Sequence, residues 1–304
     1  MKTIDEVDLI DDTFMNLVAS DPDVGEIFCR TLLSVLLQKD IGSVKVLSQR
    51  VIPGTYEGMR GIRLDVEVTE TSDKSPELIA NVYDIEPHTS KEPDMFRMMR
   101  FRQAKIDSRF MKSGDNDFSH LPDLYVILIT NFDPFGEDYM LYTINNSCAE
   151  VPTLSCDDGL KFLYFNTIGR KGGSDSIRNV LEYMQNSRKS SAVDTATKEI
   201  DKCVDNVRHD PAIRGKYMTF GDKLDREFLK GKEIGQQIGE QKTLIRQICN
   251  KMSKGMSISE IAEDLETDEA KISIICDVVR KHAPEYDQNA ILEELQSTME
   301  SALV

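Results

Sequence analysis

The feature that most constrains the fold is a continuous apolar run, Leu124-Tyr-Val-Ile-Leu-Ile-Thr130, which contains no charged residue. Seven residues rich in β-branched side chains are too few for a buried helix, and they fit a strand that is covered on both faces. Strand-like and helical runs surround it in the order helices 8–18 and 23–37, strands 44–51, 61–68 and 78–86, helix 93–112, strands 139–144 and 161–167, and helix 174–184. This order predicts an α/β fold with one mixed sheet flanked by helices.

A change of composition divides the chain. Residues 187–197 are small and polar, which predicts a linker or an exposed turn, and almost all of the sequence after them has a helical pattern. We therefore expect an α/β domain over 1–190 and an α-helical C-terminal region over 191–304. A row of glycines in that region lies on one face of a polar helix, at positions 231, 235 and 239. The row indicates either close helix packing between subunits or a weak helical connector.

A helix-turn-helix-like pattern occupies about 251–282 of the C-terminal region. Ser257 and Glu260 have the spacing of a capping box, which predicts the start of the first of two short helices. The pattern is typical of a packed helical hairpin and also of a DNA-binding module. The second helix begins with Asp268 and Glu269, which would face phosphates unfavourably, so the packed hairpin is the favoured interpretation.

The charge of the chain is strongly acidic overall but uneven. The formal net charge is −16, which disfavours unspecific binding to nucleic acid. Residues 93–112 are the exception, with six basic side chains against two acidic ones. No apolar stretch is long enough to span a bilayer and the N-terminus has no signal-peptide pattern, so we expect a cytoplasmic protein without membrane contacts.

Acidic residues alternate along two of the predicted strands. Asp65 and Glu67 share one face of the first strand, and Asp84, Glu86 and His88 share one face of the second. If the strands are neighbours, several carboxylates converge, and a cluster of oxygen ligands is what Mg²⁺ prefers. The alternative is that alternating acids mark a solvated face of the sheet.

The helix over 93–112 carries its basic residues on one face. Arg102, Lys105 and Arg109 fall within a narrow sector at about 100° per residue, and apolar residues such as Met99 and Ile106 occupy the other side. A cationic helix beside an acidic metal site is suited to holding a DNA backbone. The alternative is an ordinary amphipathic surface helix.

These segments together resemble the PD-(D/E)XK nuclease superfamily. Within it the chain resembles the recombination-promoting nuclease family, also called PD-(D/E)XK nuclease family transposases. The resemblance covers most of residues 8–240, and the ordered set of segments is more specific than any single one. The matching segments are Asp11-Asp-Thr-Phe14, Ile62-Arg-Leu-Asp-Val66, Val82-Tyr-Asp-Ile-Glu86, the arginine-rich stretch 97–107, Leu121-Pro-Asp-Leu-Tyr-Val-Ile-Leu-Ile129 and Phe132-Asp-Pro-Phe-Gly136.

The resemblance implies a restriction-endonuclease-like fold and a metal-dependent DNA endonuclease linked to recombination or mobile elements. Asp65 and Glu86 match the two motif acids that ligate Mg²⁺ (or Mn²⁺), and Asp12 matches an acid of the first helix that assists metal binding. His88 falls where the family has Lys or Gln, and a neutral imidazole can orient a water or accept its proton. Arg102, Lys105 and Arg109 are the expected contacts to DNA.

Pro87 and His88 depart from the pattern of the nuclease family, and this leaves a second hypothesis open. Proline donates no N–H, so Pro87 predicts an edge or a bulge inside the motif strand. A catalytically weakened or inactive protein that keeps the nuclease fold would then act in DNA binding or in assembly, as a homo-oligomer through the C-terminal helices. Patterns for a phosphate-binding loop, a nucleophile elbow or a zinc protease (G-x-x-x-x-G-K-[ST], G-x-S-x-G, H-E-x-x-H) do not occur in the sequence.

Overall fold

The computed structural model of the protein describes residues 2–301 except 55–57, 73–74, 112, 115, 155 and 284. The chain forms two compact units, Met1–Thr219 and Phe220–Val304. The first unit is an α/β structure and the second is entirely helical in its described part, as the sequence predicts. Neither part has a described helix that combines the length and the apolar content needed to cross a membrane.

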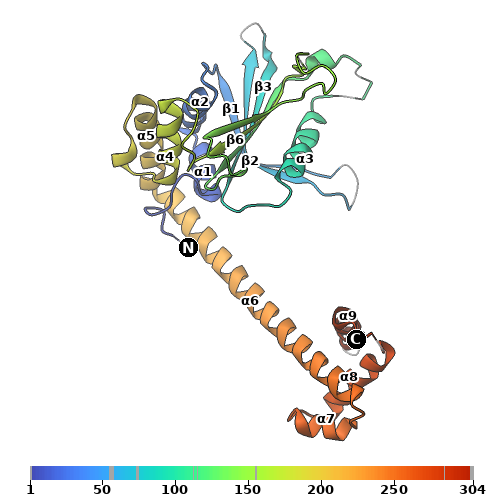
Figure 1. Ribbon diagram of the computed structural model, residues 1–304. Coiled ribbons are helices and arrows are strands. Elements are labelled where there is room, and N and C mark those ends of the chain that lie inside the picture. Colours follow the sequence, from blue (N-terminus) through green and yellow to red (C-terminus); the bar gives the residue numbers. More distant parts are fainter. Residues whose placement is uncertain are drawn as a thin grey trace. The chain divides into compact units, whose positions relative to one another are not determined.

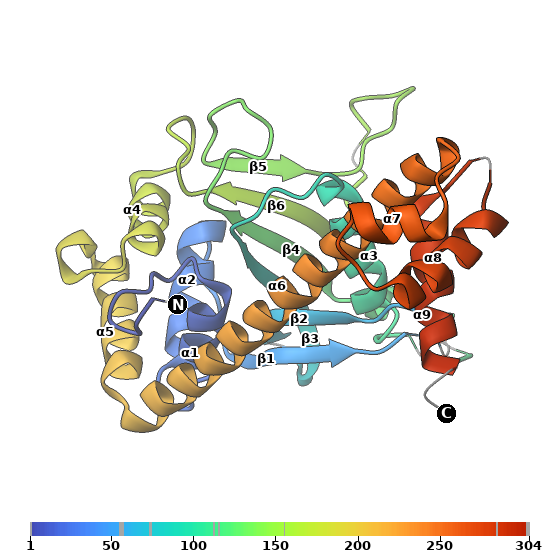
Figure 2. The same ribbon diagram turned by 90° about the horizontal axis from the view of Figure 1, so that it is seen from below.

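The first unit is built on a six-stranded mixed sheet with the order β1-β2-β3-β4-β6-β5 (Figures 1 and 2). Neighbouring strands are antiparallel from β1 to β3 and between β5 and β6, whereas β4 is parallel to both β3 and β6. The strands are β1 (Val44–Ile52), β2 (Ile62–Ser72), β3 (Ser75–His88), β4 (Asp123–Thr130), β5 (Leu141–Ile144) and β6 (Leu160–Asn166).

Helices cover both faces of this sheet (Figure 1). One face packs on the four helices α1 (Asp12–Ala19), α2 (Gly25–Leu37), α4 (Asp175–Gln185) and α5 (Thr195–His209), and the other packs on α3 (Met95–Asp107). Every residue of β4 after Asp123 is buried, with Ile127 in the core under the four helices and Val126 in the core under α3. The apolar run of the sequence is therefore the central strand covered on both sides, as predicted.

The segment expected to be a linker is part of the first unit instead. Ser187 and Thr197 are fully buried, and a short 3₁₀ helix spans Lys189–Ser191. Asp194 caps α5 by accepting the N–H of Thr197, whose hydroxyl oxygen accepts the N–H of Asp194 in return. Small polar residues are thus used here for helix capping rather than for flexibility, and the first unit continues to Thr219 instead of ending near residue 190.

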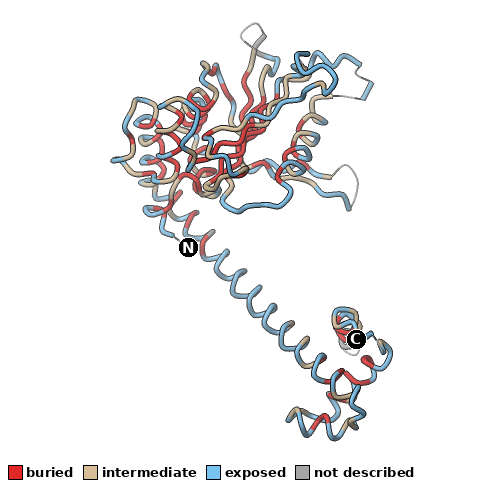
Figure 3. Tube along the Cα trace, in the orientation of Figure 1, coloured by how far each residue is buried: buried red, intermediate tan, exposed pale blue. Residues whose placement is uncertain are grey.

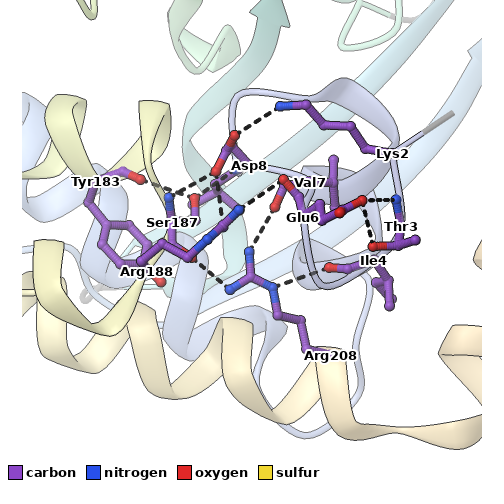
Figure 4. Close-up of polar contacts among 11 residues, drawn as sticks. Lys2, Thr3, Ile4, Glu6, Val7, Asp8, Tyr183, Ser187, Arg188 and Arg208 are labelled. Carbon is purple, nitrogen blue, oxygen red and sulfur yellow. Dashed lines mark hydrogen bonds and ion pairs between the residues drawn. The ribbon is translucent and has the colours of Figure 1, made fainter.

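The N-terminal segment is held on α4 and α5 by the guanidinium groups of Arg188 and Arg208 (Figure 4). Arg208 donates hydrogen bonds to the carbonyl oxygens of Val7 at 2.7 Å, Ser187 at 2.6 Å and Ile4 at 3.3 Å. Ser187 in turn donates its hydroxyl to the carbonyl of Tyr183 at 3.0 Å and accepts the N–H of Leu9 through its side-chain oxygen. The planar guanidinium suits this task because its donors reach several acceptors at once.

Arg208→Met is expected to lower the free energy of unfolding by roughly 2–3 kcal/mol, since three carbonyl groups lose a charged donor. Urea unfolding followed by circular dichroism measures the change. Arg30→Met is the matched control because Arg30 is exposed on α2. Equal stabilities of the two variants would show that this contact does not hold the segment.

The second unit packs around the C-terminal part of α6 (Pro211–Ser253), a helix that begins in the first unit. α7 (Ile258–Asp264), α8 (Glu269–Lys281) and α9 (Gln288–Ser301) complete it. Ile261, Ile272 and Ile275 are buried against Ile245 and other residues of α6 in one apolar core. The capping box at the start of α7 is present, and the helix-turn-helix-like pattern forms a packed helical hairpin. DNA binding by this hairpin stays a prediction.

The glycine row lies in the exposed stretch of α6 (Figure 3). A Cβ atom added at Gly231, Gly235 or Gly239 would have no described atom within 4 Å. The row is therefore not used for packing within the described part of the chain, and packing between subunits stays a prediction.

Candidate functional site

Asp65 and Glu86 meet where β2 and β3 separate. The ladder between the two strands ends at the pair Val66–Ile85, and beyond it the N–H of Asp65 donates to Oε1 of Glu86 at 2.8 Å. The Glu86 side chain thus accepts the hydrogen bond of a backbone N–H that has no partner in the β2–β3 ladder. Pro87 lies just past this point, so its missing N–H removes no bond from the β2–β3 ladder. β3 is not an edge strand here, because Pro87 still lies opposite Ile129 of β4. The structure brings the two predicted metal-binding carboxylates together.

Arg102 lies inside this acidic region and not on the outer face of α3. Its Nε and Nη2 donate to the two carboxylate oxygens of Asp84 at 2.8 and 2.9 Å, and Nη2 also bonds Oε1 of Glu86. Only 7% of Arg102 is exposed. The expected position on a cationic surface is wrong for this residue, because the fully buried Asp84 requires a paired cation.

Arg109 also points inward, because a buried acid requires a paired cation. Glu67 is fully buried and is bound by Arg109 at 2.6 Å and by Arg50 of β1 at 2.8 Å. Lys105 of the predicted basic set is half-buried, with its Nζ 5.7 Å from the centre of the Phe101 ring. Two of the three residues predicted to contact DNA are therefore engaged in ion pairs beneath α3.

Helix α1 contributes a polar group that the sequence analysis missed. Asn16 is 6% exposed; its Nδ2 donates to the carbonyl of Asp12 at 2.8 Å. Its Oδ1 is buried and has no hydrogen-bond partner among the described atoms. Asp12 itself is exposed and accepts the N–H of Thr13 at 2.6 Å. Asn16 follows Asp12 by four residues, a spacing that places both on one side of a helix. This spacing is the sequence signal that could have identified Asn16.

The electrostatics of the junction favour a cation. Burial raises the pKa of Asp65, and the charge of Asp12 raises it further, while a hydrogen bond with Glu86 and the side chains of Arg102 and Asn16 lower it. Burial also raises the pKa of Glu86 well above its ordinary value, with Asp84 and Asp65 adding repulsion that Arg102 offsets only in part. Carboxylates held close together in a buried place are stabilised when a positive charge joins them.

The stability of the protein should therefore depend on the protonation of Glu86. Because the pKa of Glu86 is raised above its ordinary value of 4.5, the folded chain binds this proton more tightly than the unfolded chain. The resulting stability is complete below pH 4.5 and is lost as the pH rises through the folded pKa. Glu86→Gln removes this dependence, so we expect the variant to gain stability relative to the wild type as the pH increases.

Urea unfolding of both proteins between pH 4.5 and 8 measures that difference. Glu26→Gln, at an exposed position of α2, serves as the control and should follow the wild type. If the difference in free energy of unfolding between the wild type and Glu86→Gln does not change with pH, the raised pKa of Glu86 is contradicted.

The donor atoms present fit a hard divalent cation in part. Asp65 and Glu86 offer carboxylate oxygens, and the unpartnered Oδ1 of Asn16 is a neutral oxygen donor of the kind that Mg²⁺ and Ca²⁺ accept. Within the described ranges, three or more His, Cys, Asp or Glu side chains are nowhere arranged to hold a metal ion. Protein oxygens would thus fill some coordination positions and leave others for water or substrate, as Mg²⁺ commonly requires.

His88 lies at the end of β3, opposite Thr130 of β4. Alternation along the strand places it on the same side as Glu86. Its Nε2 is buried and has no hydrogen-bond partner in the described structure, and its ring centre is 6.4 Å from that of Phe132. An unsatisfied ring nitrogen two residues from Glu86 is available to a water or a substrate oxygen.

The Asp-Pro-Phe-Gly segment after β4 is a structural turn. Asp133 accepts the N–H groups of Phe135, Gly136 and Asp138 and the hydroxyl of Tyr142. These donors lower the pKa of Asp133 against the opposing effect of burial. The carboxylate is fully used in closing the turn, so this segment positions β4 and adds no acid to the site.

The scan against protein-family models, the search of curated proteins and the search of solved structures each found no match.

Proposed function

We propose that the first unit is a metal-dependent DNA endonuclease with a restriction-endonuclease-like fold. The observation that carries the proposal is the junction of β2 and β3, where Asp65 and Glu86 meet and the Asn16 side chain contacts Asp65. The buried Oδ1 of Asn16 has no hydrogen-bond partner among the described atoms. Two carboxylates and an amide oxygen in a partly buried place are a donor set for Mg²⁺ or Mn²⁺.

The topology supports the same proposal. Three antiparallel strands are followed by α3, which crosses to β4 lying parallel to β3. The segments that resemble the PD-(D/E)XK nucleases follow the same order of elements. One motif acid lies on each of the two strands that separate. The link to recombination or mobile elements rests on that resemblance alone.

In this proposal Asp65, Glu86 and Asn16 hold the cation. When bound, the cation lowers the pKa of a water and neutralises charge that develops on a phosphodiester. Arg102 fixes the orientation of Glu86 through the shared oxygen, Oε1. The Nε2 of His88 accepts a hydrogen bond from the attacking water and orients it toward phosphorus.

Supercoiled plasmid incubated with the wild-type protein tests the proposal. We expect nicked or linear plasmid with Mg²⁺ or Mn²⁺ and intact plasmid with EDTA. Intact plasmid in the presence of either metal, from protein whose circular dichroism spectrum shows it folded, would contradict catalysis.

A second candidate function is supported by the ion pairs of Arg102. Because this guanidinium bonds both Asp84 and Glu86, it supplies positive charge that a metal would otherwise provide. A protein with this arrangement could keep the fold for DNA binding or assembly without hydrolysis. Metal-independent DNA binding by a protein that does not cut would favour this candidate.

A further inference from the structure

A cationic groove lies between the start of β2 and helix α3. Its volume is about 640 Å³, and four arginines line it together with Phe101: Arg60, Arg63, Arg97 and Arg102. Arg60, Arg63 and Arg97 are exposed. Two acids, Glu92 and Asp94, also line the groove, so the formal charge of the lining is 4 − 2 = +2 in a chain whose net charge is −16.

Two exposed arginines of the groove make only weak contacts within the described part of the chain. Arg97 lies 3.6 Å from Asp94 in an exposed ion pair, and pairs of that kind contribute little. Arg63 donates to the side-chain oxygen of Gln49 at 3.3 Å, a neutral partner. Arg102, by contrast, is committed to Asp84 and Glu86. The three exposed arginines are thus suited to anionic ligands, and Arg102 connects the groove to the acidic junction.

The groove also exposes an aromatic ring. Phe101 is 37% exposed on the α3 side of the groove. Proteins that bind single-stranded nucleic acid combine a cationic groove with aromatic rings on which bases stack. A duplex hides the faces of its bases, so contacts to it are mostly made through phosphates and groove edges.

We propose that this groove binds single-stranded DNA, with backbone phosphates on Arg60, Arg63 and Arg97 and one base stacked on Phe101. The inference deepens the proposed nuclease function and rests on it for the choice of DNA as ligand. It assigns the DNA contacts to residues other than Arg102 and Arg109, whose guanidinium groups are held beneath α3. A strand seated there reaches the junction through Arg102.

Fluorescence anisotropy in EDTA tests the groove without requiring cleavage. The probes are a labelled 20-nucleotide single strand of mixed sequence and the corresponding duplex, each titrated with the full-length protein. We expect the wild type to bind the single strand at least about tenfold more tightly than the duplex, since only the single strand offers bases for stacking.

The arginine contacts are tested with the triple variant Arg60→Gln/Arg63→Gln/Arg97→Gln. Its slope of log K against log salt concentration should be smaller by about 2, at roughly 0.7 per phosphate contact to a single strand. The charge-matched control is Arg30→Gln/Lys198→Gln/Lys202→Gln, which removes three exposed cations from α2 and α5. The control should keep the wild-type slope.

The stacking contact is tested with Phe101→Ala, which should weaken binding of the single strand about tenfold and leave duplex binding unchanged. Phe118→Ala is the control, because Phe118 is 70% exposed and does not line the groove. Equal affinity of the wild type for both probes, or equal losses in the groove and control variants, would overturn the inference. Failure of the plasmid assay with retained, groove-dependent binding would overturn the proposed hydrolysis and leave the groove assignment standing.

Discussion

Asp65→Asn is expected to reduce metal-dependent DNA cleavage by roughly 10²- to 10³-fold. A bound cation contributes several kcal/mol of transition-state stabilisation, and the substitution replaces one of the two charged ligands proposed for it by an amide. The variant should fold normally, because burial already raises the pKa of Asp65 and a neutral side chain is tolerated better there than a charge. Initial rates of plasmid nicking measure the effect.

Asp40→Asn is the matched control for this loss. Asp40 is exposed, and its substitution makes the same change of charge and volume away from the junction. It should cut DNA at the wild-type rate. Cleavage by Asp65→Asn within a factor of about three of the wild type would show that this carboxylate is not part of the catalytic site, whatever the effect of EDTA.

The second large effect is expected on stability. Arg102→Met should lower the free energy of unfolding by about 3–5 kcal/mol, because removing one partner leaves buried carboxylates without a compensating charge. Asp84 is fully buried and loses both of its charged hydrogen bonds. Methionine keeps most of the side-chain volume, so the loss is electrostatic and not a cavity effect. Urea unfolding at neutral pH measures it.

Arg100→Met on the same helix provides the control, because Arg100 is exposed and should change stability by less than about 0.5 kcal/mol. The double variant Asp84→Asn/Arg102→Met should recover part of the lost stability, since one of the stranded charges is then absent. A loss below about 1 kcal/mol for Arg102→Met alone would mean that the acids beneath α3 do not depend on this arginine.

Sequence patterns predicted a mixed sheet with one strand buried on both faces, and they predicted that Asp65 and Glu86 meet if their strands are neighbours. The apolar run ending at Thr130 leaves no face for solvent, which places it at the centre of a sheet covered on both sides. Alternation put Asp65 on one strand and Glu86 on the next, and an antiparallel pairing of consecutive strands brings them together. These inferences depend on local periodicity, which a single sequence contains.

What escaped prediction depends on contacts between distant segments. The helical spacing of Arg102 is compatible with an outward or an inward position, and the buried acids of β2 and β3 decide between them. Asn16 was not singled out from the sequence, because the burial that leaves its Oδ1 without a partner among the described atoms depends on the tertiary structure. The polar stretch around Ser187 resembled a linker because its hydrogen bonds to the N-terminal segment lie about 180 residues away in the chain.

The central claim is that the β2–β3 junction holds a divalent cation, and isothermal titration with Mn²⁺ tests it most directly. We predict that wild-type protein binds Mn²⁺ with a defined stoichiometry, that Asp65→Asn abolishes this binding, and that Asn16→Ala weakens it about tenfold or more. Asp40→Asn should bind as the wild type does. Absence of Mn²⁺ binding by the folded wild-type protein, or binding unaffected by Asp65→Asn, would contradict the claim.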